Sequence, residues 1–175
     1  MSKRPVRRIR YLVASSLDGY IAGPKGEADW IISDPDFDFH ARYNEFDTVL
    51  LGRRTFETMV RARRAVMPGM NMLVFSRTLR QSDFSGVTMV AGKPEEALAN
   101  LGTNSVKDVW LFGGGVLFRS LLDAGLVDTV EVAITPILLG GGIPLLPAPA
   151  NEAKLKLTNH HVYKTGVVSL QYTVK

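Results

Sequence analysis

The feature that most constrains the fold is an alternation of buried-strand and helix patterns through the middle of the chain. Short apolar runs typical of buried strands occur at residues 47–51, 72–76, 87–90 and 106–112, and helical patterns occur at residues 55–64, 93–101 and 116–124. Strands joined through helices are typical of crossover connections, which place strands parallel with helices packed against the sheet. The sequence therefore predicts an α/β fold of three layers, with a mainly parallel central sheet and helices on both of its faces.

The segments on either side of this region extend the sheet. Residues 8–15 are apolar on both faces, as a central strand is, and the loop 16–35 contains a brief extended stretch at 20–22. Further elements are expected as a short helix at 36–45, a strand at 129–139, a glycine- and proline-rich loop at 140–149 and an antiparallel hairpin within 154–175. No stretch has the composition of an interdomain linker, so we expect one domain over residues 1–175, with residues 1–7 as a flexible basic tail.

Composition and charge narrow the classes of protein. The chain contains no cysteine, which excludes disulfides, thiolate zinc sites and a cysteine nucleophile, and we expect no metal site. The net charge is +4, with basic residues near the start and between residues 53 and 64. The apolar stretch after the basic start stops at Ser15 and Asp18, too short for a signal-peptide core or a membrane span. A cytoplasmic protein without membrane contact is the expectation.

One junction between a strand and a helix consists of glycine alone, at Gly113-Gly114-Gly115. Without side chains the backbone can approach a phosphate closely, and the first N–H groups of the following helix point toward it. A tight turn that merely closes the joint is nearly as good an interpretation. The chain has neither Gly-x-Gly-x-x-Gly nor a Walker lysine, which disfavours two common nucleotide-binding folds.

Two further junctions carry arginine and hydroxyl groups. Gly52-Arg53-Arg54-Thr55 opens the helix at 55–64, and Ser76-Arg77-Thr78 follows the next strand. The planar fork of arginine suits a phosphate monoester better than the point charge of lysine does. Because strands of a parallel sheet end at the same edge, the three junctions are expected to converge on one extended, multiply phosphorylated ligand.

In their order and approximate spacing these motifs resemble the dihydrofolate reductase-like superfamily. The resemblance is strongest to the reductase domain of the bifunctional riboflavin-biosynthesis deaminase-reductase, and it extends over residues 8–175. The motifs that carry it are Ser16-Leu17-Asp18-Gly19-Tyr20-Ile21-Ala22, the Gly-Arg-x-Thr turn at Gly52, Ser76-Arg77, Phe112-Gly113-Gly114-Gly115 and Pro136-Ile137-Leu138-Leu139-Gly140-Gly141-Gly142.

The resemblance implies an NADPH-dependent reductase with a dihydrofolate reductase-like fold. It assigns the adenosine 2'-phosphate to Arg53 and Arg77, helped by the neighbouring Gly52, Arg54, Thr55 and Ser76. The pyrophosphate is assigned to Gly113, Gly114 and Gly115 with the amides of Val116 and Leu117, and the nicotinamide to Ala14 and Ile21. The implied activity is hydride transfer to a small heterocyclic or phosphoribosyl-type substrate, as in 5-amino-6-(5-phosphoribosylamino)uracil reductase.

The substrate end is less well defined. The spacing of dihydrofolate reductase from Gly52 points to Asp36 as a catalytic carboxylate, although Asp34 and Asp38 lie within two residues and any of them is a plausible helix cap. On a helix, Asp36 and His40 would share a face and contact substrate together, with Trp30 as an aromatic wall.

Two other positions bear on the chemistry at this end. Asp18 either orients a ribose or amide as a second catalytic candidate, or bonds its own backbone in a turn. The later-strand threonine of dihydrofolate reductase is replaced by Ala133, which weakens a folate assignment.

Several alternatives stay open from sequence. The nearest is a dihydrofolate or pterin reductase. Outside enzymes, the chain could be a non-catalytic nucleotide-binding regulator, or a basic nucleic-acid binder that uses residues 3–10 and 61–64. No binding motif supports the last, so the expected partner is a small molecule and not nucleic acid. The apolar alternation of the C-terminal hairpin also suggests a homodimer.

Overall fold

A computed structural model describes residues 7–99, 101 and 105–175, so most of the expected basic tail lies outside the described residues. The strands are β1 Ile9–Ser16, β2 Tyr20–Ala22, β3 Phe46–Gly52, β4 Asn71–Phe75, β5 Thr88–Val90, β6 Asp108–Gly113, β7 Thr129–Thr135, β8 Ile143–Pro144, β9 Leu155–Val162 and β10 Val168–Val174. The helices are α1 Phe39–Tyr43, α2 Arg53–Arg61, α3 Pro94–Ala99 and α4 Gly115–Asp123, with a 3-10 turn at Gln81–Asp83.

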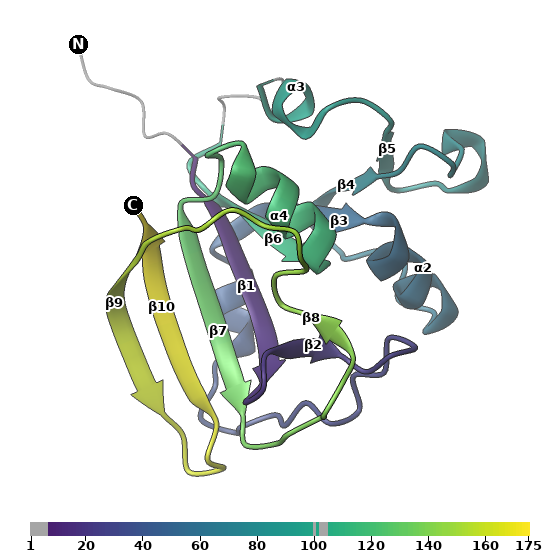
Figure 1. Cartoon of the computed structure of the whole chain (residues 1–175). Helices are drawn as coiled ribbons and strands as arrows, with labels where there is room; N and C mark the ends of the chain where they lie inside the picture. The colour runs from purple at the N-terminus through teal and green to yellow at the C-terminus, as the bar shows by residue number, and fades with distance from the viewer. Residues whose placement is uncertain (1–6, 100, 102–104) are drawn as a thin grey trace.

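Within these residues the strands form an eight-stranded sheet in the order β5-β4-β3-β6-β1-β7-β10-β9 (Figure 1). All pairs from β5 to β7 are parallel, and β10 runs antiparallel to both β7 and β9. A separate small ladder joins β2 to β8. The mainly parallel sheet and the antiparallel C-terminal hairpin are therefore confirmed.

Helices cover both faces of the sheet because its strands are apolar on both sides. Helix α4 buries Leu117, Phe118 and Leu121 against one face, where the ring of Phe118 stacks on Tyr11 at a centroid separation of 3.9 Å. Helix α2 buries Phe56 in a second cluster on the other face, together with residues of β3, β4 and β6. The sheet thus divides the hydrophobic core into two halves, one packed against each of its faces.

Two element boundaries differ from the sequence prediction for identifiable reasons. Strand β7 ends at Thr135 instead of residue 139, because Pro136 has no N–H with which to continue the ladder. Helix α1 is shorter than the expected 36–45, since it begins after Asp38, whose carboxylate accepts the N–H of Ala41 at 2.8 Å. The cap is therefore Asp38 and neither Asp34 nor Asp36.

The N-terminal arginines that the structure describes are tied into the fold. Arg7, expected in a flexible tail, forms an ion pair with Asp47 and donates to Thr48 at 2.9 Å. Arg10 is only 3% exposed and makes a two-pronged pair with Glu131, its Nε lying 2.6 Å from Oε1. Arg7 and Arg10 are therefore held by acidic side chains of the folded domain.

No helix in residues 7–99, 101 and 105–175 is long and apolar enough to cross a membrane. In the same residues, no group of three or more His, Cys, Asp or Glu side chains is placed to hold a metal ion.

Candidate functional site

Two glycine turns lie side by side at the carboxyl edge of the sheet. Strands β3 and β6 are neighbours, with Leu51 opposite Gly113, so the turns that follow them meet. A Cβ built on Gly52 would lie 3.5 Å from the nitrogen of Gly114, and one built on Gly114 would lie 3.2 Å from Oγ1 of Thr55. The sequence prediction that these junctions converge is therefore supported by their geometry.

Both turns lead into helices whose first N–H groups have no side-chain cap. Gly52 is the N-cap of α2 and Gly114 is the N-cap of α4, and neither position makes a side-chain cap hydrogen bond. The first amides of a helix have no intrahelical partner, and the helix dipole adds partial positive charge there. Two such helix starts at one edge make a surface suited to a pyrophosphate.

The three glycines of the second turn differ in what they do. Gly113 has φ +137°, a conformation that favours glycine, and the Gly113–Gly114 peptide bond is cis. A Cβ on Gly115 would lie 2.6 Å from the carbonyl oxygen of Pro144 and 2.8 Å from Cδ of Pro147. Gly115 is therefore required for the close packing of α4 against β8 and the loop that follows it, independently of any ligand.

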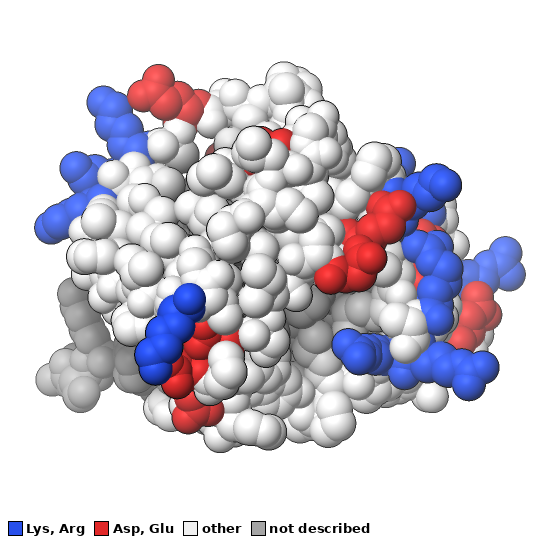
Figure 2. Space-filling view, turned by 90° about the horizontal axis from the view of Figure 1, so that it is seen from below, with Lys and Arg blue, Asp and Glu red and all other residues white. Residues whose placement is uncertain are grey.

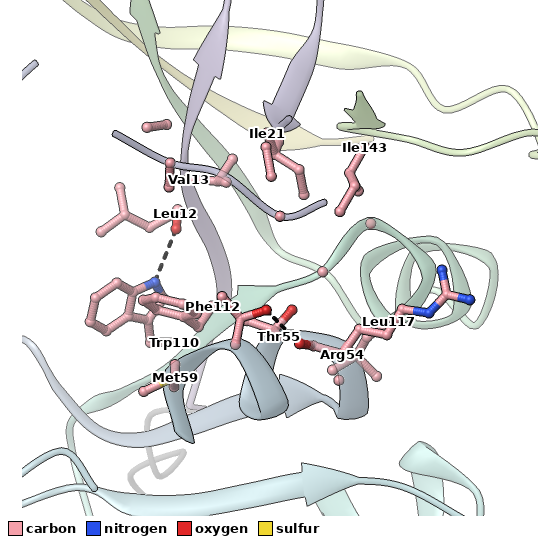
Figure 3. A pocket seen from close by; sticks show the side chains of 18 of the residues that line it. Leu12, Val13, Ile21, Arg54, Thr55, Met59, Trp110, Phe112, Leu117 and Ile143 are labelled. Atoms are coloured by element: carbon pink, nitrogen blue, oxygen red, sulfur yellow. Dashed lines mark hydrogen bonds between the residues drawn. The ribbon is translucent and has the colours of Figure 1, made fainter. Parts of the chain in front are cut away.

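These turns open into a large cleft with a volume of about 2550 Å³. It is lined by all the predicted cofactor residues except Gly113, namely Ala14, Ile21, Gly52, Arg53, Arg54, Thr55, Ser76, Arg77, Gly114, Gly115, Val116 and Leu117. Figure 3 shows Ile21 and Ile143 on one side of this space and Thr55 and Phe112 on the other. Ligand pockets usually hold about 300–1,000 Å³, so the cleft has room for a dinucleotide and a second molecule.

The charge of the cleft is strongly positive on the side of α2. Figure 2 shows Lys and Arg side chains gathered there beside the hollow. Arg53 is paired with Glu57, with Nη1 and Oε1 3.1 Å apart, whereas Arg54 and Arg77 make no ion pair with the described residues. The other basic lining residues are Lys25, Arg42, Arg61, Arg63, Arg64 and Lys93, and the acidic ones are Asp34 and Glu57. An anionic ligand is favoured by this excess.

Ser76 has an indirect place in this arrangement. Its hydroxyl accepts the N–H groups of Thr78 at 3.2 Å and Leu79 at 3.0 Å. These bonds fix the turn after β4 that presents the exposed side chain of Arg77. Ser76 lines the cleft, but its oxygen is already committed to the turn.

The structure places Asp36, the predicted catalytic carboxylate, away from the cleft. The Asp36 side chain is 60% exposed, lies outside the cleft and faces Lys164 at 3.5 Å. It also precedes α1, which begins at Phe39, so Asp36 and His40 do not share a helix face. His40 does line the cleft, and it does so without a carboxylate partner from Asp36.

The buried carboxylate of this region is Asp34, and it is occupied by the protein. Oδ2 of Asp34 accepts Oγ1 of Thr165 at 2.6 Å and the Thr165 N–H at 3.3 Å, while Oδ1 accepts the Asp36 N–H at 2.8 Å. The hydrogen bond from Thr165 holds the pKa of Asp34 below its ordinary value. Asp34 therefore fastens the long loop to the turn between β9 and β10.

Asp18, the second predicted catalytic residue, is a loop anchor. Its carboxylate accepts Oγ of Ser16 at 2.6 Å, the Leu139 N–H at 3.1 Å and the Gly140 N–H at 2.7 Å. The Ser16 hydrogen bond is the main cause that lowers the pKa of Asp18. Asp18 does not line the cleft, and its contacts reach further along the chain than the predicted local turn.

Trp30, predicted to form an aromatic wall for the substrate, does not line the cleft. Its Nε1 donates to the carbonyl of Glu27 at 3.1 Å, and it is not among the lining residues. The aromatic wall comes from elsewhere, from Phe37, Phe39, Tyr43, Trp110, Phe112 and Tyr163. Phe37, Phe39 and Phe112 could be singled out from sequence. Tyr43, Trp110, Tyr163 and Ser169 on β10 could not, because their strands and loops meet only through sheet order and register.

Comparison with known proteins agrees with this geometry. Residues 7–169 match the family model of the RibD C-terminal domain. The uncharacterized protein YyaP of Bacillus subtilis (strain 168) is 34% identical over 178 residues, which cover 95% of this chain and 94% of that protein.

Two solved structures show the fold. A protein from Shewanella sp. PV-4, assigned to riboflavin biosynthesis by its description, matches with TM-score 0.81 and 28% identity, covering 97% of this chain and 99% of that one. Dihydrofolate reductase from Enterococcus faecalis, complexed with NADP(H), matches with TM-score 0.70 and 20% identity, covering 96% of each chain. The dihydrofolate reductase-like fold expected from sequence is thereby confirmed, and the chain belongs to the RibD C-terminal domain family.

Proposed function

We propose that this chain is an NADPH-dependent reductase of a small molecule, of the kind that reduces 5-amino-6-(5-phosphoribosylamino)uracil. The observation that carries the proposal is the meeting of two uncapped helix starts with Arg54 and Arg77, which pair with no acidic side chain of the described residues, in one cleft. Membership of the RibD C-terminal domain family supports it. A regulator that only binds nucleotides could have the same phosphate-binding turns. Hydride transfer to a substrate distinguishes a reductase from such a regulator.

The residues present fit such a cofactor. The amides of Gly115 and Val116, behind the glycine turn, would hold a pyrophosphate, and Arg54 and Arg77 would hold a further phosphate monoester. Arg53 would share its guanidinium between this phosphate and Glu57. When bound, NADPH supplies the hydride.

The chain would contribute position and exclusion of water. Ala14 is small and partly buried at the end of the central strand, which leaves room for a flat ring against the sheet. Leu12, Ile21 and Ile143 surround this space with apolar side chains (Figure 3). A ring and a substrate held next to each other there would react without a bimolecular encounter.

A phosphorylated substrate is supported by a second group of arginines. Arg63 and Arg64 line the cleft beyond the C-terminal end of α2, away from the glycine turns. A pterin is less well supported, because the resemblance to dihydrofolate reductase calls for a free carboxylate, and both oxygens of Asp34 already accept hydrogen bonds.

The proposal is tested by titrating NADPH and NADH against wild type, Arg53→Ala and Arg77→Ala. We expect wild type to prefer NADPH, and each substitution to weaken NADPH binding by about 1.5–3 kcal/mol with little effect on NADH. Arg80→Ala is the matched control, since Arg80 is exposed and lies outside the cleft. Equal affinity of wild type for both cofactors would contradict the proposal.

The reaction itself is tested by following NADPH oxidation with 5-amino-6-(5-phosphoribosylamino)uracil and, separately, with dihydrofolate. Turnover of the first substrate is the expected result. NADPH binding without oxidation by either substrate would favour a binding protein over an enzyme.

A further inference from the structure

A row of four residues in register leads across the sheet from Ala14, at the expected nicotinamide position, and its first three members line the cleft. Ala14 on β1 is in register with Ala133 on β7, Ala133 with Ser169 on β10, and Ser169 with His161 on β9. Residues paired in this way point to the same face of a sheet. Ala14, Ala133 and Ser169 line the cleft, so the face they share is the cleft floor.

Ser169 is the first polar group met along this row from the central strand. It is half-buried, and its hydroxyl forms no hydrogen bond with residues 7–99, 101 and 105–175. Some other hydroxyls that line the cleft are already bonded: Tyr43 donates to the carbonyl of Pro68 at 2.8 Å, and Thr58 donates to that of Arg54 at 3.0 Å. The Ser169 hydroxyl is therefore free to bind a ligand.

The distance between Ser169 and Ala14 leaves room for a small ring between them. Neighbouring strands lie about 4.8 Å apart, so the backbone of Ser169 is roughly 10 Å from that of Ala14. If a nicotinamide ring were held against Ala14, a substrate beside it would lie over Ala133, within reach of Ser169. The small side chain of Ala133 leaves this space open.

The surroundings favour a flat and uncharged part of the substrate at this point. Phe37 and Tyr163 meet edge to face with ring centroids 6.1 Å apart, and both line the cleft. The carboxylate in this wall, Asp34, has its oxygens bonded to Thr165 and to the Asp36 amide. A cationic ring would find no free carboxylate among the lining residues here, whereas a neutral ring with a carbonyl edge would find the Ser169 hydroxyl.

We propose that Ser169 is a specificity-determining residue, whose hydroxyl donates a hydrogen bond to a carbonyl oxygen on the edge of a planar substrate lying over Ala133. This inference rests on the proposed reductase function and adds the residue that selects the substrate. A site that hydrogen-bonds one polar edge rejects analogues that lack it, because its own polar group is then left unpaired.

The test measures binding of 5,6-diaminouracil to the NADP⁺-saturated protein by NMR titration. We expect Ser169→Ala to raise the Kd of this probe about fivefold to twentyfold, through loss of one hydrogen bond, and to leave the Kd of NADP⁺ unchanged. Ser169→Thr keeps the hydroxyl and should retain most of the affinity. Thr158→Ala is the matched control, because Thr158 is a hydroxyl on the same hairpin that bonds the carbonyl of Gln171 outside the cleft.

The outcomes separate this inference from the proposed function. Equal Kd values of the probe for wild type and Ser169→Ala would overturn the inference, as would no binding of the probe to a wild-type protein that binds NADP⁺. Failure to bind NADP⁺ would overturn the proposed function instead. In that case the same titration on the cofactor-free protein still decides whether Ser169 contacts the probe.

Discussion

The two ends of the cleft are built in different ways. The proposed cofactor end consists of strand-to-helix turns, in which neighbouring residues of the chain together form the surface. The substrate end consists of single side chains from α1, β6, β7, β10 and the hairpin turn. Backbone amides at a helix start are fixed by the helix itself, whereas the substrate end is fixed by contacts between distant segments. Substitutions should therefore act locally at the first end and through tertiary contacts at the second.

Gly115→Ala should have the largest effect on stability, because its Cβ would meet the backbone oxygen of Pro144 at 2.6 Å. We expect a loss of about 1–3 kcal/mol in the free energy of unfolding, measured with urea. Gly141→Ala is the control, since a Cβ there has no atom within 4 Å. If both variants unfold alike, the close packing of α4 on the loop after β8 is not what requires glycine.

At the substrate end, Asp34→Asn should change how stability depends on pH. The folded pKa of Asp34 lies below its ordinary 3.8, so its ionised form stabilises the fold above that pH. This contribution is lost as the pH falls through the lowered pKa.

The variant should therefore be less stable than wild type at neutral pH and show a flatter acid dependence below about pH 4, as measured by urea unfolding at several pH values. Thr165→Val removes the main hydrogen-bond donor and should reproduce part of the change. Identical pH profiles would mean that Asp34 does not fasten the loop to the hairpin.

Tyr11→Phe tests the packing beneath α4, the helix that follows the second glycine turn. Tyr11 is fully buried against Phe118 of α4, and its hydroxyl has no hydrogen-bond partner among the described residues. Burial accordingly raises the pKa of the hydroxyl. Removing it should leave stability unchanged or raise it by up to about 1–2 kcal/mol in thermal unfolding. Marked destabilisation would reveal a partner for this hydroxyl.

Asp36→Asn should have the smallest effect. Asp36 is exposed and its pair with Lys164 is a surface ion pair, so we expect a change of less than about 0.5 kcal/mol in unfolding and no change in the kcat of the proposed reduction. A large loss of kcat with unchanged stability would restore the catalytic role that the spacing of the sequence predicts.

The same contrast explains which residues could be placed in the cleft from sequence. Gly52-Arg53-Arg54-Thr55 and Gly113-Gly114-Gly115 could be placed from sequence, because a parallel sheet brings the ends of its strands to one edge. The side chains of Asp36 and Trp30 could not be placed from sequence, since the direction of a side chain in a long loop depends on what that loop packs against. Asp34 was considered from sequence, but its partner Thr165 lies 131 residues away.

The sequence by itself determined the alternation of strands and helices, the absence of cysteine chemistry and the residues of the two glycine turns. These are local properties, in which hydrophobic period, glycine and charge act within a few residues of each other. Only the tertiary structure decided the substrate end. Strand order and register set Ser169 beside Ala133, moved Asp18 and Asp36 out of the cleft and tied the carboxylate of Asp34 to the hairpin, because contacts between segments far apart in the chain have no local signature.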